Sequence, residues 1–114
     1  MAALKPFDAL ALWREVLVER VSGEAPDLSE RQMAILLTVY MKPPPHTVRG
    51  LAAQLKISKP AVTRALDKLG YHDFIHRKRD DGDRRNVLVQ RTVAGSNFVS
   101  EFGELIARIA HSAQ

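Results

Sequence analysis

Residues 51–91 carry the pattern that most restricts the fold of this chain: two short helical runs joined by a turn, and then two extended runs. Ser58 separates the helical runs, and serine is a preferred residue for capping the start of a helix. Pro60 falls in the following first turn, where its missing amide hydrogen costs little. The apolar positions on both sides have helical spacing: Leu51, Ala52, Leu55, Ile57, Val62, Leu66 and Leu69. The pattern predicts two short helices with a tight turn, the first over Val48–Leu55 with Thr47 as its N-cap.

The segment after the second helix has the pattern of a β-hairpin. Phe74–Arg79 and Asn86–Arg91 alternate or run apolar as strands do. The connection between them, residues 80–85, is rich in aspartate and glycine, which favour turns. A helix-turn-helix followed directly by a two-stranded hairpin is a winged helix. The predicted fold class is therefore mainly α with a small β-wing, an α+β winged helix.

Two further helices are predicted ahead of this unit. Residues 3–22 form one with apolar residues on nearly every side, more than packing against one neighbour requires. Ser29 and Gln32 form a capping box that begins the other, and three prolines at 43–45 end it. The apolar positions of this helix follow helical spacing: Met33, Leu36, Leu37 and Tyr40.

A last helix is predicted to begin after Thr92 and to end near His111. Its apolar stripe consists of Phe98, Phe102, Leu105 and Ile109. The first and last helices together carry more apolar surface than a small winged helix needs for its own core. We therefore expect a two-fold homodimer, with pairing helices at 1–25 and 93–111 around a core at 28–92. The alternative is that the two helices cover each other within one protomer.

Length and composition fit a single domain. The chain has 114 residues, of which 46% are apolar, which argues against disorder. It has no cysteine, which excludes disulfides and cysteine-ligated zinc and is typical of a cytoplasmic protein. No apolar run approaches the length of a membrane span, and no secretory signal is expected at the N-terminus.

Positive charge is concentrated in the helix-turn-helix and hairpin. Between Lys56 and Arg91 there are ten Lys or Arg against five Asp, a net charge of +5. The remainder has seven basic and eight acidic residues, a net charge of −1. A basic patch on a nearly neutral scaffold is typical of a protein that binds a polyanion such as DNA. An ordinary solvated face is the alternative for the charge taken alone.

The second helix of the motif carries the candidate contacts to DNA. Arg64 can present a two-pronged donor to guanine in the major groove, and Thr63 lies beside it. Ser58 and Lys59 lie at the start of the helix, where exposed amides and the helix dipole favour phosphate. Lys68 is expected to contact phosphate or to be solvated.

Four blocks of sequence resemble the MarR family of bacterial transcription regulators. They are Leu51-Ala52-x-x-Leu55-x-Ile57-Ser58, Val62-Thr63-Arg64, Asp83-Arg84-Arg85-Asn86-Val87-Leu88-Val89 and Thr92-x-x-Gly95. The resemblance runs from about Leu28 to Gly95. The chain departs from the family at Asp73, where relatives usually have glycine, at Arg91, where they usually have leucine, and in its shorter C-terminal region.

The resemblance implies a role for the tip of the hairpin. Arg85 matches the family arginine that enters the minor groove, and Asp83 matches the acid that orients it. Arg84 is expected to lie near phosphate. The family also implies a repressor that binds a palindromic operator as a homodimer, with a small aromatic effector as a possible partner. Trp13 and Tyr40 could line an effector pocket, although aromatic residues at helical spacing are more often core.

Other functions have little support in the sequence. No catalytic grouping or glycine-rich phosphate loop is recognisable, so neither an enzyme nor a cofactor is expected. His72 and His76 lack a third nearby donor for a metal site. The remaining alternative to a DNA-binding regulator is a winged helix that only contacts other proteins.

Overall fold

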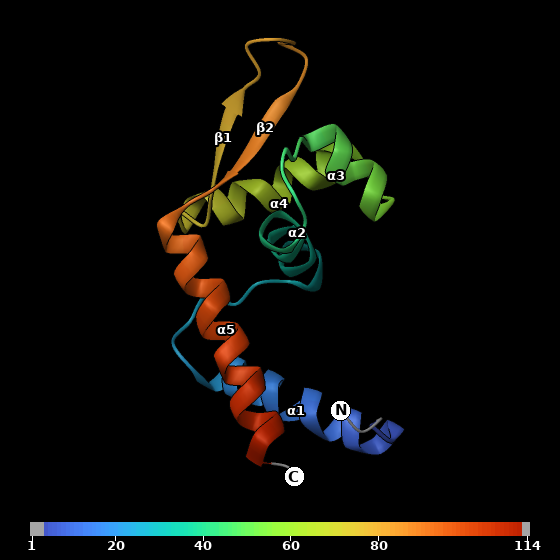
Figure 1. Ribbon diagram of the computed structural model, residues 1–114, viewed down its shortest axis with the longest axis vertical. Coiled ribbons are helices and arrows are strands. Elements are labelled where there is room, and N and C mark those ends of the chain that lie inside the picture. The colour runs from blue at the N-terminus through green and yellow to red at the C-terminus, as the bar shows by residue number, and fades with distance from the viewer. Residues whose placement is uncertain (1–3, 113–114) are drawn as a thin grey trace. The chain divides into compact units, whose positions relative to one another are not determined.

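The computed structural model describes residues 4–112, so positions 1–3 of the predicted first segment lie outside the described residues. Five helices and one antiparallel hairpin follow one another along the chain, which confirms the predicted fold class (Figure 1). Their bounds are α1 Pro6–Ser22, α2 Glu30–Met41, α3 Val48–Leu55, α4 Lys59–Tyr71, β1 Ile75–Arg79, β2 Val87–Arg91 and α5 Val93–Ser112. The described residues divide into two compact units, Leu28–Val99 and the combination of residues 4–27 with residues 100–112.

The core of the unit Leu28–Val99 lies where α2 and α3 pack against α4. Its fully buried large side chains include Ile35, Leu36, Val39, Leu51, Val62, Leu66 and Leu69. The predicted apolar positions of α2 were partly wrong, because Ile35 and Val39 are buried whereas Leu37 and Tyr40 are only half-buried. A helix with neighbours on more than one side buries a wider arc than a single stripe.

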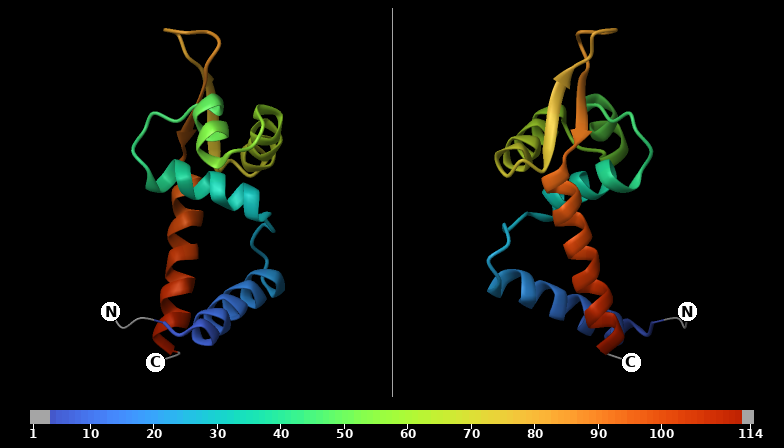
Figure 2. Two further views of the ribbon diagram at one scale, coloured as in Figure 1. Left: turned by 90° about the vertical axis from the view of Figure 1, so that its right-hand side faces the viewer. Right: turned by 60° about the vertical axis from the view of Figure 1, so that its left-hand side comes forward.

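The hairpin extends away from α2, α3 and α4 with its turn at the far end (Figure 2). β1 and β2 pair antiparallel from Ile75 opposite Arg91 to Arg79 opposite Val87. An antiparallel bridge between Thr47 and Leu88 adds a third, very short extended segment beside β2. The hairpin is thereby attached along β2 to the residues that precede α3.

Side-chain caps at the predicted residues begin α2, α3, α4 and α5. Ser29 and Gln32 form both hydrogen bonds of the capping box. The hydroxyl oxygens of Thr47, Ser58 and Thr92 each accept a hydrogen bond from a backbone amide three residues later. Each cap satisfies an amide that has no partner within its helix.

Tyr40 connects the ends of the hairpin to α2. Its hydroxyl donates to the carbonyl oxygen of Phe74 at 2.7 Å and accepts from the amide of Thr92 at 3.0 Å. The hydroxyl of Thr92 donates in turn to the carbonyl oxygen of Asp73 at 2.6 Å. Because Tyr40 bonds to backbone groups, its hydroxyl has a structural role, which favours the core interpretation of this residue over an effector pocket.

The second unit joins α1 to the C-terminal part of α5. Val16, Phe102 and Ile109 are buried in it. The guanidinium of Arg20 lies 5.3 Å from the centre of the Phe102 ring. A second, large set of apolar side chains on α1 and just before it remains exposed: Leu4, Phe7, Leu10, Trp13, Leu17, Val18 and Val21.

Candidate nucleic-acid interface

α4 presents one polar side to solvent. The side that packs on the rest of the unit is formed by Ala61, Val62, Ala65, Leu66 and Leu69. The positions between them are exposed, and they are Thr63, Arg64, Asp67 and Lys68. Helical spacing places these four side chains together on the side of α4 that faces away from α2 and α3.

The start of α4 is fixed by Ser58. Its hydroxyl oxygen accepts a hydrogen bond from the amide of Ala61 at 3.2 Å, and the hydroxyl hydrogen can still donate outward. Lys59 is the first residue of the helix and is exposed. Because the first amides of a helix attract anions, Ser58 and Lys59 border a surface suited to a phosphate group.

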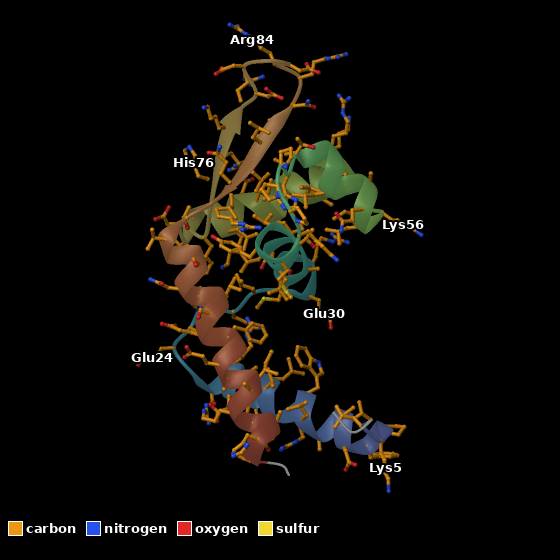
Figure 3. The ribbon with its side chains drawn as sticks, in the orientation of Figure 1. Lys5, Glu24, Glu30, Lys56, His76 and Arg84 are labelled. Carbon is orange, nitrogen blue, oxygen red and sulfur yellow. The ribbon has the colours of Figure 1, made fainter. Side chains whose placement is uncertain are left out.

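The turn between α3 and α4 takes only residues 56–58. Lys56 adopts a left-handed conformation with φ of 57°, which reverses the chain at the end of α3. Its side chain extends outward from that end of α3 (Figure 3). The tight turn holds α3 and α4 in the arrangement of a helix-turn-helix.

An ion pair joins the exposed side of α4 to the hairpin. The carboxylate of Asp67 lies 2.9 Å from a guanidinium nitrogen of Arg77, in β1. Asp67 follows Arg64 by one helical turn, so both lie on the same side of α4. The hairpin therefore begins next to the side of α4 that carries Arg64.

The turn of the hairpin holds a two-pronged arginine–carboxylate pair. Arg85 donates from Nε to one carboxylate oxygen of Asp83 at 3.1 Å and from Nη2 to the other at 3.2 Å. The Arg85 side chain remains 78% exposed, so the pair orients the guanidinium without removing it from solvent. Arg84 lies at the far end of the hairpin, where its carbonyl oxygen accepts a hydrogen bond from Arg79 at 2.7 Å (Figure 3).

The electrostatics of the hairpin turn involve a residue that the sequence analysis did not single out. Hydrogen bonds from Arg85 hold the pKa of Asp83 below its ordinary value of 3.8, and the charge of Arg49 contributes further to this lowering. Arg49 is exposed in the first turn of α3, two residues after the Thr47–Leu88 bridge. The signal available in the sequence was a basic residue in the first turn of a predicted helix. Its proximity to Asp83 depends on the packing of α3 against β2, which local spacing does not reveal.

The eight predicted site residues form two groups in the structure. Ser58, Lys59, Thr63, Arg64 and Lys68 lie on α4 or at its start, and all five are exposed. Asp83, Arg84 and Arg85 lie at the turn of the hairpin, where only Asp83 is half-buried. The Asp67–Arg77 ion pair joins the helix that carries the first group to the hairpin that carries the second, and no local sequence pattern predicts this pair.

The sequence model of the MarR family matches residues 28–87, more than half of the chain. This protein belongs to the MarR family. It therefore belongs to a family of winged helix-turn-helix transcriptional regulators, which are not enzymes. No curated protein sequence matches the chain.

Solved structures of the MarR family share the fold. A structure of MarR is 24% identical with a TM-score of 0.70, covering 93% of this chain and 79% of that one. MepR of S. aureus in complex with DNA is 20% identical with a TM-score of 0.73, covering 93% of this chain and 82% of that one. The regulator BldR of Sulfolobus solfataricus is 26% identical with a TM-score of 0.64, covering 96% of this chain and 84% of that one.

Across residues 4–112, no three His, Asp or Glu side chains are grouped so that they could hold a metal ion. Within the same part of the chain, no helix combines the length and the hydropathy needed to cross a membrane.

Proposed function

We propose that this protein is a sequence-specific regulator of transcription that binds double-stranded DNA as a homodimer on a roughly palindromic operator. The observation that carries the proposal is the pairing of Asp67 with Arg77, because it sets the hairpin beside the side of α4 that exposes Arg64. A reading helix and an adjoining hairpin can then contact one duplex at neighbouring grooves. Among the solved structures of similar fold, MepR is in complex with DNA and AbfR is bound to DNA.

The side chains of α4 divide by their chemistry. Arg64 is proposed to read guanine, because a guanidinium matches its two major-groove acceptors, and Thr63 lies beside it in the groove. Ser58 and Lys59 are proposed to hold phosphate at the start of the helix. Lys68, near its end, is proposed as a further phosphate contact.

The hairpin is proposed to enter the minor groove through Arg85. A narrow minor groove concentrates negative potential and attracts a planar guanidinium. The Asp83 carboxylate keeps Arg85 in one orientation before DNA arrives, which lowers the entropy lost on binding at some cost in net attraction. Arg84, exposed at the turn, is proposed to lie near phosphate.

The homodimer is proposed from the exposed apolar side chains of α1. Phe7 is 82% exposed and Val21 is 77% exposed, although both are strongly apolar. A second copy would cover this surface, with residues 1–25 and 93–111 as the pairing helices. Two-fold pairing would set two copies of α4 about one DNA turn apart, which is why a palindromic operator is expected. Occupying a promoter would repress transcription in the cytoplasm.

The proposal is tested by selecting bound fragments from a random pool of duplexes at several salt concentrations. A palindromic consensus is expected, with a log–log salt slope near −5 if about six phosphates are neutralised per dimer. Arg64→Ala should relax the consensus, whereas Arg85→Ala should weaken binding to every duplex. Equal affinity of wild type and the Arg64/Arg85 double variant would remove the proposal and favour a winged helix that contacts only proteins.

A further inference from the structure

Arg91, the last residue of β2, bonds to the C-terminal end of α2. Its Nε donates to the carbonyl oxygen of Val39 at 2.8 Å, and its Nη2 donates to that of Lys42 at 2.9 Å. The guanidinium carbon lies 5.8 Å from the centre of the Tyr40 ring. The Arg91 side chain therefore joins the base of the hairpin to the end of α2. Its partner Val39 lies 52 residues earlier in the chain.

The end of α2 needs such a donor. The last carbonyl groups of a helix have no partner within it, and the three residues that follow Lys42 are prolines, which have no amide hydrogen to offer. His46 supplies one further donor, since its Nε2 lies 3.0 Å from the carbonyl oxygen of Lys42. The positive charge of Arg91 also lies at the negative end of the helix dipole.

Several contacts attach the hairpin to the rest of its unit, and the Tyr40 hydroxyl already bonds to the backbone at both of its ends. The Asp67–Arg77 pair joins β1 to α4. The amide of Val89 donates to the carbonyl oxygen of His46 at 2.8 Å, which joins β2 to the segment before α3. Arg91 adds a side-chain attachment from the end of β2 to α2, and α2 itself packs against α4. The direction of the hairpin relative to α4 depends on these contacts together.

We propose that Arg91 is a positioning residue for DNA recognition, which sets the hairpin and hence Arg85 at the angle to α4 that one duplex requires. The inference rests on the proposed DNA-binding function. Arg91 does not touch DNA in this role, because its guanidinium is directed at backbone carbonyl groups.

A double-mutant cycle on the selected duplex tests the proposal. In wild type, Arg85→Ala is expected to weaken binding about tenfold, and in the Arg91→Met background the same change should cost less than about threefold. Arg64→Ala should cost the same in both backgrounds to within about twofold, because α4 keeps its own packing. If Arg91 acted only through its charge or through overall stability, the effects of Arg85→Ala and Arg64→Ala on binding would be the same in both backgrounds.

Arg91→Lys provides the charge-matched comparison and a second background if Arg91→Met fails to fold. Lysine keeps the charge but lacks the planar fork, so it should reproduce part of the loss of coupling with Arg85. An undiminished effect of Arg85→Ala in a folded Arg91 variant would overturn the positioning role while leaving DNA binding intact. Failure of wild type to bind any selected duplex would instead overturn the proposed function itself.

Discussion

The hydroxyl group of Tyr40 lies against the α-carbon of Gly95, in the space where a side chain would begin. A β-carbon built on Gly95 would overlap the Tyr40 hydroxyl and the Phe74 carbonyl oxygen, and it would lie 2.8 Å from Cζ of Tyr40. The same hydroxyl bonds to the backbone of Phe74 and Thr92. Glycine at this position therefore allows the first turn of α5 to approach α2 closely.

Gly95→Ala should destabilise the protein by about 1–3 kcal/mol, because the added methyl group displaces Tyr40 from its hydrogen bonds. Gly103→Ala is the matched control in the same helix, since nothing lies within 4 Å of the β-carbon it would add. That change should be stabilising by up to about 1 kcal/mol, through helix propensity alone. Thermal unfolding monitored by circular dichroism measures both, and equal effects would contradict the close approach.

Replacing Asp73 with glycine should increase the stability of the fold. Its φ is 60°, in the left-handed region where a β-carbon is unfavourable. Asp73→Gly is expected to stabilise the fold by about 0.5–1 kcal/mol, whereas Asp73→Val should destabilise it by more than about 1 kcal/mol. Chemical denaturation of both variants checks the prediction, and it fails if valine is tolerated as well as glycine.

Asp83→Asn should weaken DNA binding at elevated salt. The change removes half of the charged pair that orients Arg85, but it also removes a negative charge near the phosphates. High salt screens the second effect, so a loss of about threefold should remain there. Stronger binding by the variant at every salt concentration would show that orientation of Arg85 contributes nothing.

The lowered pKa of Asp83 implies that this residue leaves operator affinity independent of pH near neutrality. Because the folded pKa of Asp83 is lowered from 3.8, its ionised form and its pairing with Arg85 are retained above that value and are lost only as the pH falls through the lower folded pKa. Between about pH 5 and pH 8, Asp83 should therefore contribute no change in operator affinity. Binding measured across that range in wild type and Asp83→Asn should give parallel curves.

Phe7→Glu should weaken the homodimer. Phe7 is 82% exposed, and we expect the partner protomer to cover it. Because a two-fold dimer contains this contact twice, the free energy of dimerisation should be weakened by about 1.5–3 kcal/mol for each of the two rings. Tyr71→Glu changes an equally exposed aromatic residue, 82% accessible, at the end of α4 and outside both proposed pairing helices, and it serves as the control. Sedimentation at several concentrations should show dissociation of the first variant only, and an unchanged dimer would reject α1 as the pairing helix.

Arg49→Gln should reduce the salt dependence of DNA binding. The Arg49 charge reaches Asp83 at the turn of the hairpin, so we expect it to neutralise one phosphate per protomer. The log–log slope should then become less steep by about 2 per dimer. Arg14→Gln, in α1 with a side chain that is 71% exposed, is the control for lost charge. An equal change in slope for both variants would remove Arg49 from the interface.

The sequence predicted the features that depend on neighbouring residues. Capping residues such as Thr47 and Ser58 begin helices where expected, because a cap acts within one turn of the helix. The bond from Arg91 to Val39 and the pair of Asp67 with Arg77 join different elements. No local spacing reveals such contacts, so the orientation of the hairpin could not be predicted. The DNA contacts of the eight site residues stay predictions.

The attachment of Arg91 to α2 also changes how the charge of this chain is to be counted. Ten basic residues lie between Lys56 and Arg91, but Arg77 is neutralised by a carboxylate and Arg91 is occupied by carbonyl groups. These two cations are part of the framework and release no counterions when a duplex binds. Substituting Arg77 or Arg91 should therefore change the net charge of the protein without changing the salt dependence of DNA binding, whereas substituting Lys59, a proposed phosphate contact, should change both.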